Sequence, residues 1–505
     1  MARYIDPRST KGPRPPIRLR YYLFAFAVLA AFLVLAHAPL LRLPFFWDEA
    51  GQFVPASLDI YRTGAWIPVS TVPNIHPPGV MAYLAAFWFA FGYSIEATRI
   101  AMLLIAAAGA LFTFLLAIEL ARGSPGTPAF IALAMLCLSP LFFAQSMLAQ
   151  LDMPAMCLSA LALLLFLQGR IQACAFACVA LAITKETGLV IPAIFAGWLL
   201  FERRGREACW FLLPVTLLAV WLAALHHATG YWVGNPAFGD YNLRYPLNPW
   251  RFLLALLRRI YYLFIGTGHI IGTAVLLFAW KRMPHFRSRP WRIAGSLVAA
   301  QMLIVSLFGG AVLERYLLPA LPVVFAGFAV SLQALTPVVR RWALAGSIVS
   351  LAAANFVNPA YPFPFENNLA FVDFVELERS AAGAVESRGS GTVATVFPVA
   401  DALRHPEFGF VDRGRRVIEI ADFSELQVRK LQAARPEMVL VCTRDWDPLG
   451  LLTHPSFRQF AEEHYGYVPE LRPGEIAEML HMQVAGRWKR HGLSMELLAR
   501  DGRYR

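Results

Sequence analysis

The chain has 505 residues, of which 58% are hydrophobic and only 15% are charged, and its formal net charge is +12. Soluble domains are about a quarter charged, so this composition excludes an ordinary soluble enzyme and indicates an integral membrane protein. Many of the lysines and arginines lie in short segments between apolar runs. That pattern is typical of membrane topology and not of nucleic-acid binding.

The N-terminus is basic, and the apolar run at 21–41 that follows it is too long for the hydrophobic region of a signal peptide. The run also lacks a clear small-residue cleavage site, so we expect a retained first span. Because cytoplasmic loops collect Lys and Arg, residues 1–20 are predicted to lie in the cytoplasm and the first span to end near Pro44. Asp48 and Glu49 then lie on the outer face of the membrane.

This acidic pair lies in the sequence Phe-Phe-Trp-Asp-Glu-Ala-Gly at 45–51. Carboxylates at membrane depth are costly unless they face an aqueous cavity or a cation, so Asp48 and Glu49 indicate a functional site. The alternative is that both are hydrated loop charges at the membrane surface.

The next apolar run, at 80–91, is shorter than the ~17 residues that span a bilayer. If it crossed, the very basic loop at 281–289 would lie outside, against the positive-inside rule. We therefore interpret it as a juxtamembrane or re-entrant helix within a large outer loop of about residues 43–96. His76 precedes this helix in His-Pro-Pro-Gly, where the prolines hold the chain extended; a turn histidine without function is the alternative.

Ten further spans follow, which makes eleven. The second is predicted at about 97–120, the third at about 129–143 and the seventh at about 209–225, and the eleventh ends near Asn355. Basic segments then fall on the inner side, and several charges of the later loops share the outer face with Asp48. These outer residues are Asp152, Lys185, Glu186 and Arg315.

From residue 358 the composition becomes that of a soluble domain. Strands are predicted at 392–397, 416–420 and 436–442, and an amphipathic helix at 423–431. This alternation implies a small α/β domain on the outer side, following a transmembrane module at 21–357. It carries no Gly-rich phosphate loop and no evident catalytic triad, so we expect it to cover the site or to bind an acceptor. A structural cap without chemistry is the alternative.

Each remaining outer charge has a second interpretation. Asp152 lies in Leu-Asp-Met-Pro, where a helix N-cap is common. Lys185 and Glu186 are adjacent and form a self-neutralising pair in the alternative. Arg315, followed by Tyr316, is suited to hold a phosphate through two parallel hydrogen bonds, and the alternative is that its side chain extends to the lipid headgroups.

Together these groups suit a reaction between an anionic, lipid-borne donor and a polar acceptor. A carboxylate can take the proton of an acceptor hydroxyl, while Arg, Lys or His stabilises charge on a phosphate leaving group. A divalent metal held by Asp48 and Asp152 is an alternative for the second task.

The order of these motifs resembles that of the GT-C glycosyltransferases that use polyprenyl-phosphate sugars. Asp-Glu at 48–49 follows the first span, His-Pro-Pro at 76–78 precedes a short apolar helix, Asp152 follows the third span, Lys185 ends the fifth, and Arg-Tyr-Leu-Leu-Pro begins at Arg315. The protein O-mannosyltransferase group and the bacterial lipid A aminoarabinose transferase group are the most similar. The resemblance covers roughly residues 20–355.

The resemblance implies a GT-C-like helical membrane fold in which Asp48 is the catalytic carboxylate, with Glu49 beside it and Asp152 as its partner. It assigns contacts with the lipid phosphate to His76, Lys185, Arg315 and Tyr316. The mannosyltransferases tend to continue His-Pro-Pro with Leu-Gly-Lys, whereas this chain has Gly-Val-Met at 79–81. That departure weakens the inference of a mannosyl donor or a protein acceptor.

The expected function is therefore an inverting glycosyltransferase of the bacterial inner membrane. Its predicted partners are a polyprenyl-phosphate sugar donor, a periplasmic lipid, glycan or protein acceptor, and the bilayer, but no nucleic acid. A transporter or flippase of lipid-linked sugars is the alternative. Transporters often have paired halves with broken helices at matching positions, and the sequence contains no such repeat.

Overall fold

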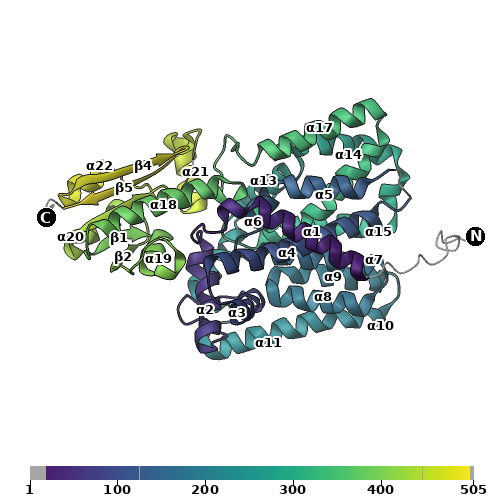
Figure 1. Cartoon of the computed structure of the whole chain (residues 1–505), viewed down its shortest axis with the longest axis horizontal. Helices are drawn as coiled ribbons and strands as arrows, with labels where there is room; N and C mark the ends of the chain where they lie inside the picture. Colours follow the sequence, from purple (N-terminus) through teal and green to yellow (C-terminus); the bar gives the residue numbers. More distant parts are fainter. Residues whose placement is uncertain (1–18, 124–125, 446, 501–505) are drawn as a thin grey trace, which may run out of the picture.

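The computed structural model describes residues 19–123, 126–445 and 447–500. A helical body makes up most of it, and a five-stranded sheet with its own helices, here called the sheet domain, lies at one end of that body (Figure 1). Residues 1–18 lie outside the described residues, and with them most of the segment expected in the cytoplasm.

The helical body follows the predicted order of apolar runs. Its helices are α1 (Leu19–Ala36), α2 (Val54–Thr63), α3 (Gly79–Phe91), α4 (Ile95–Leu120), α5 (Pro128–Leu138), α6 (Pro140–Gln145), α7 (Asp152–Leu167), α8 (Ile171–Thr184), α9 (Val190–Phe201), α10 (Gly205–Ala208), α11 (Leu212–Thr229), α12 (Pro236–Gly239), α13 (Pro249–Phe264), α14 (His269–Arg282), α15 (Arg289–Leu307), α16 (Leu321–Ser331) and α17 (Pro337–Ala353).

Several of these helices are long and apolar enough to cross a membrane. Within the described chain they are the stretches 19–36, 95–120, 205–229, 289–307 and 314–334, and the pair α13 and α14, bent by 42°, forms a sixth candidate. Other apolar helices have only 10–17 residues, among them α5, α7 and α8. A multi-pass helical membrane protein is thus confirmed, but the count of eleven spans is not.

The short helices α7 and α8 end where charged residues lie. At 1.5 Å per residue, α7 is roughly 24 Å long, less than the ~30 Å hydrocarbon core of a bilayer. α7 begins at Asp152, and α8 ends one residue before Lys185. Both charges therefore lie at helix ends inside the bundle and not at the end of a full-length span.

The expected short helix in the first outer loop is present as α3. It buries Trp88 and leaves Phe89 and Phe91 exposed, which fits a helix at a lipid boundary. The same loop contains α2, which the sequence did not indicate. Both helices lie at the edge of the helical body nearest the sheet domain (Figure 1).

The sheet domain has the strand order β2-β1-β3-β5-β4. The predicted strands and helix are present as parallel β1 (Val393–Val396), β2 (Val417–Ile420) and β3 (Met438–Cys442), and as α20 (Glu425–Ala434). The other helices are α18 (Ala370–Ser387), α19 (Val399–Arg404), α21 (Pro455–Tyr465) and α22 (Pro473–Leu480). The antiparallel pair β4 (Gln483–Arg490) and β5 (Leu493–Ala499) was missed because β4 is exposed and rich in charge.

The sheet domain is attached directly to the first loop of the helical body. The backbone N–H of Phe45 donates to the carbonyl of Phe408 at 3.2 Å. The Tyr93 hydroxyl donates to the carbonyl of Glu407 at 2.7 Å. The first loop, which carries Asp48, is therefore hydrogen-bonded to the sheet domain near both of its ends.

Candidate active site

A cavity of about 2110 Å³ lies between the helical body and the sheet domain. Residues of the first loop, of the segments before α7 and α9, and of 308–316 line one side, and residues following β1, β2 and β3 line the other. Six of the seven site residues predicted from the sequence line this cavity. They are Asp48, His76, Asp152, Lys185, Arg315 and Tyr316.

The backbone around Trp47 presents Asp48 to the cavity. Trp47 has φ of +47°, a left-handed conformation that is uncommon for a bulky residue and marks local strain. Its indole packs against the rings of Phe374 and Phe397, at centroid distances of 5.6 and 5.8 Å. A π-helical stretch, Glu49–Phe53, follows directly, and such stretches are frequent at functional sites.

Glu49 points away from the cavity that Asp48 lines. Its side chain is fully buried and forms an ion pair with Arg99. It also accepts hydrogen bonds from the backbone N–H groups of Phe46 at 2.9 Å and Ala149 at 2.6 Å. The carboxylate thereby joins the first loop to the segment before α7, and the two acidic neighbours have different surroundings.

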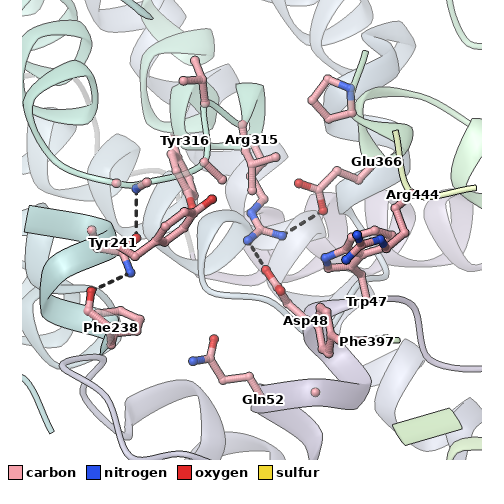
Figure 2. A pocket seen from close by; sticks show the side chains of 18 of the residues that line it. Trp47, Asp48, Gln52, Phe238, Tyr241, Arg315, Tyr316, Glu366, Phe397 and Arg444 are labelled. Atoms are coloured by element: carbon pink, nitrogen blue, oxygen red, sulfur yellow. Dashed lines mark hydrogen bonds and ion pairs between the residues drawn. The ribbon is translucent and has the colours of Figure 1, made fainter. Parts of the chain in front are cut away.

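Arg315 connects the carboxylates of the site (Figure 2). One terminal nitrogen pairs with Oδ2 of Asp48, and the other donates to Gln150 Oε1 at 2.7 Å and to Glu366 Oε2 at 2.8 Å. Its Nε lies 3.2 Å from Oδ2 of Asp152. Because Arg315 is only 4% exposed, the interpretation in which it extends to the headgroups is wrong.

Asp152 and Lys185 form a buried ion pair. Asp152 is the first residue of α7, the N-cap position is Leu151, and the Asp152 carboxylate is paired with Lys185 and Arg315, so the N-cap interpretation is not what the structure contains. The Lys185 ammonium also lies 4.2 Å from the ring centre of Tyr316, a cation–π contact. Asp152 thus receives positive charge from both Lys185 and Arg315.

His76 is paired with Glu186 at the same cavity. Its Nδ1 lies 2.8 Å from Glu186 Oε2, and its ring packs near those of Phe53 and Phe238, at 6.0 and 5.5 Å. Glu186 therefore pairs with His76, and the self-neutralising pair proposed for Lys185 and Glu186 does not form.

Glu366 was not predicted and belongs to the centre of the site. It lies in a short 3₁₀ helix, Phe365–Asn367, between α17 and α18. Burial raises the pKa of its carboxyl to about 7 although Arg315 acts in the opposite direction. Its Oε1 has no hydrogen-bond partner among the described residues. The signal in the sequence was a single acidic residue within Phe-Pro-Phe-Glu-Asn-Asn at 363–368.

Arg251 of α13 is a second unpredicted residue of the cavity wall. Its Nη2 donates to the carbonyl of Gly310 at 2.8 Å, and its guanidinium lies over the ring of Tyr245 at 3.1 Å and near that of Tyr465 at 5.0 Å. Nε and Nη1 are buried without a partner, and no carboxylate of the described chain pairs with it. Arg251 is therefore available to an anionic ligand.

The residues around Asp48 do not fit a resident divalent metal. Asp48 and Asp152 both direct an oxygen to Arg315, whose guanidinium lies between them. Nowhere in the described ranges do three His, Cys, Asp or Glu side chains form a group suited to a metal ion. The side chains of the site must therefore supply its chemistry themselves.

Comparison with known proteins identifies the fold. No protein-family model and no curated protein matches this chain. The crystal structure of ArnT from Cupriavidus metallidurans bound to undecaprenyl phosphate is 14% identical, with a TM-score of 0.57 over 95% of this chain and 98% of that one. Its apo structure has the same identity and coverage and a TM-score of 0.56.

A third solved structure is more distant. The apo oligosaccharyltransferase of Archaeoglobus fulgidus is 11% identical, with a TM-score of 0.46 over 84% of this chain and 70% of that one. The likeness to ArnT, at 14% identity, establishes the fold. The expected resemblance to the lipid A aminoarabinose transferase group, within the GT-C glycosyltransferases, is thus confirmed at the level of the fold.

Proposed function

We propose that this protein is a membrane glycosyltransferase that moves a sugar from a polyprenyl-phosphate donor to an acceptor outside the bacterial inner membrane, with Asp48 as the catalytic carboxylate. One observation carries the proposal. Oδ2 of Asp48 is held by Arg315, while Oδ1 has no partner among the described residues and Asp48 lines the cavity. A carboxylate fixed in this way is arranged to accept a proton.

The reaction forms one bond and breaks another at the anomeric carbon of the donor sugar. The oxygen of an acceptor hydroxyl attacks that carbon from the side opposite the phosphate, and the bond between the carbon and the phosphate oxygen breaks. Polyprenyl phosphate leaves with the bonding electrons. Asp48 takes the hydroxyl proton, and the product has the inverted configuration at that carbon.

Arg315 serves this step as a positioning residue. Its planar fork fixes the direction of the Asp48 carboxylate, and Asp152 and Glu366 fix the fork in turn. Lys185 pairs with Asp152 and offsets its charge. Without Lys185, the carboxylates of Asp48, Asp152 and Glu366 would share the single positive charge of Arg315. We therefore assign Asp152 and Lys185 to the support of Arg315.

The existing ion pairs bear on where the donor phosphate binds. The resemblance assigned the phosphate to Lys185 and Arg315, yet the charge of both is already matched by Asp48, Asp152 and Glu366. Arg251 lines the cavity and has no carboxylate partner, and its buried Nε and Nη1 have no hydrogen-bond partner among the described residues.

We propose that Arg251 binds the phosphate, because a phosphodiester monoanion matches the charge of one unpaired guanidinium. Arg251, Tyr241 and Asp48 all line the same cavity.

We also propose that the cavity faces the periplasm. The segment at 202–206 is rich in arginine, and α10, which begins within it at Gly205, lies at the end of the helical body away from the sheet domain (Figure 1). Basic segments favour the cytoplasmic side. The sheet domain and the cavity are then on the opposite side.

The test is consumption of a radiolabelled polyprenyl-phosphate sugar in bacterial membrane vesicles that contain the protein, because these vesicles also supply the envelope acceptor. We expect wild type and the control Glu96→Gln to release the lipid phosphate, and Asp48→Asn to bind the donor without consuming it. Glu96 is a half-exposed acid that pairs with Arg42 outside the cavity lining. If wild type and Asp48→Asn both only move the intact lipid across the bilayer, the protein is a transporter and the enzyme proposal is wrong.

A further inference from the structure

The sheet domain has a ligand crevice at the edge that faces the cavity. In the order β2-β1-β3, the chain leaves β1 toward β2 on one side, whereas it leaves β3 toward β5 and β4 on the other. Between β1 and β3 the connections therefore diverge at the carboxyl ends of two parallel strands. In open α/β sheets this is the position at which ligands bind.

The residues that follow these two strands line the cavity. After β1 come Phe397 and Asp401, and after β3 come Arg444 and Asp445. Figure 2 shows Phe397 beside Trp47, and the centres of these two rings are 5.8 Å apart. The crevice thus opens on the same cavity as Asp48.

This wall of the cavity is acidic. Between residues 397 and 470 its lining includes two arginines and six carboxylates, which are Asp401, Glu419, Asp422, Asp445, Asp447 and Glu470. Both arginines are paired: Arg404 with Asp401 at 3.4 Å and Glu419 at 2.6 Å, and Arg444 with Glu470. Among the lining residues between 397 and 470, no Lys or Arg is left unpaired to receive a phosphate or a carboxylate of an acceptor. The unpaired Arg251, near Tyr465, belongs to the proposed donor site.

Glu366 supplies an independent indication of a bound hydroxyl. The residue is 4% exposed and lines the cavity, and its Oε1 has no hydrogen-bond partner among the described residues. A buried polar atom without a partner is costly, so a ligand group that donates a hydrogen bond is favoured there. Through Arg315, Glu366 is held next to Asp48.

Aromatic rings complete the wall. They come from α21 and the residues after it, and the lining includes Phe457, Phe460, Tyr465 and Tyr467. Their flat faces provide apolar area, and the tyrosines add a polar edge. Aromatic faces together with hydrogen-bond acceptors suit a sugar ring, which has apolar faces and a rim of hydroxyls.

We propose that the acceptor is an uncharged, polyhydroxylated glycan that binds in the crevice between β1 and β3, with its attacking hydroxyl at Asp48 and Glu366. This inference rests on the proposed function and names the acceptor class for the same site. A phosphorylated acceptor would place its anion against the acidic wall, and juxtaposed like charges oppose binding.

Binding is tested apart from turnover, on full-length protein in nanodiscs of zwitterionic lipid by saturation-transfer NMR. The probes are neutral tetrasaccharides built from glucose, galactose or mannose, and the same glycans with a terminal phosphate. We expect at least one neutral glycan to bind, and its phosphorylated form to bind about tenfold more weakly at low salt.

Two variants and one control locate the site. Phe457→Ala is expected to weaken binding of the neutral glycan, and Asp445→Asn to reduce the discrimination against the phosphorylated one. Both side chains line the cavity. Glu462→Gln, an exposed acid of α21 outside the lining, is expected to change neither quantity.

Donor consumption, measured on the same samples, separates the two proposals. If no neutral glycan binds, or if the phosphorylated forms bind better, the acceptor proposal is wrong even where the donor is consumed. If a neutral glycan binds and the donor is never consumed, the proposed function fails while the glycan site stands.

Discussion

Arg315 and Asp48 are 267 residues apart in the chain and form the ion pair that holds the proposed catalytic carboxylate at the cavity wall. The arginine is the second residue of a helical stretch, Glu314–Ala320, late in the bundle, and the aspartate ends the strained turn after α1. The site therefore exists only when the first loop and the last third of the helical body are assembled together.

Arg315→Lys is expected to retain the fold and lose most activity. An ammonium keeps the charge but cannot direct parallel hydrogen bonds to several carboxylates, so we expect kcat to fall by about 10²-fold or more. Arg315→Ala, which leaves buried carboxylates without a cation, should also destabilise the protein by about 3 kcal/mol. Donor turnover and thermal unfolding of both variants check this, and an active Arg315→Lys would contradict it.

Substitutions at Asp48 and Glu49 are expected to affect different properties, turnover in the first case and stability in the second. Asp48→Asn should abolish turnover with little loss of stability, because the side chain is partly exposed and its neighbours remain. Glu49→Gln should lower the free energy of unfolding by about 2 kcal/mol, since it leaves Arg99 buried without its counter-charge. The measurements are the melting temperature and the activity per folded molecule. A stable but inactive Glu49→Gln would mean that the assignment of catalysis to Asp48 and not to Glu49 is wrong.

Glu366 should make stability depend on pH. Its folded pKa of about 7 exceeds the ordinary value of 4.5, so the folded state binds the proton more tightly and loses stability as pH rises from about 4.5 through 7. The loss amounts to about 3 kcal/mol at most. Glu366→Gln removes it, so this variant should gain stability relative to wild type between pH 5 and pH 8. Equal pH profiles in thermal unfolding would contradict the assignment.

Gly51→Ala is expected to disturb the contact between the first loop and the sheet domain. A Cβ at this position would overlap the Phe397 ring, so the ring or the loop must move, and activity should fall. The double variant Gly51→Ala/Phe397→Ala should recover part of it. Gly197→Ala, where a Cβ meets no atom within 4 Å, is the control, and equal activity of both single alanine variants would refute the contact.

Arg251→Gln should weaken donor binding while leaving the Asp48 centre in place. We expect the KM for the polyprenyl-phosphate sugar to rise about tenfold, as for the loss of one charge-assisted hydrogen bond. Arg244→Gln is the control, because Arg244 is exposed and outside the cavity lining. The same KM for both variants would mean that the phosphate binds elsewhere.

Sequence reasoning identified the residues of the site better than their partners. Depth in the membrane and the positive-inside rule brought Asp48, Asp152, Lys185 and Arg315 to one face, and the structure brings them to one cavity. Which charge pairs with which depends on the tertiary packing of distant segments, so the neighbours Lys185 and Glu186 could not be separated by pattern alone.

The remaining errors have similar physical causes. Adjacent residues in a helical turn point in different directions, and this separates Glu49 from Asp48. Glu366 lies in a proline-rich connection without periodicity, where no local rule predicts burial. The short helices α7 and α8 carry no length signal of a full span, which is why the count of spans stayed uncertain while the order of the helices was correct.

The packing of Phe397 on Gly51 limits how such a protein can change. An exchangeable recognition module needs an interface that tolerates new sequences. Here, however, Phe397, which follows β1 at the proposed acceptor site, packs against the backbone of Gly51, three residues after Asp48. A new sheet domain grafted after α17 would also replace Glu366 and disturb the catalytic turn. Acceptor preference and catalytic geometry are thus expected to evolve together, by small compensating substitutions and not by exchange of domains.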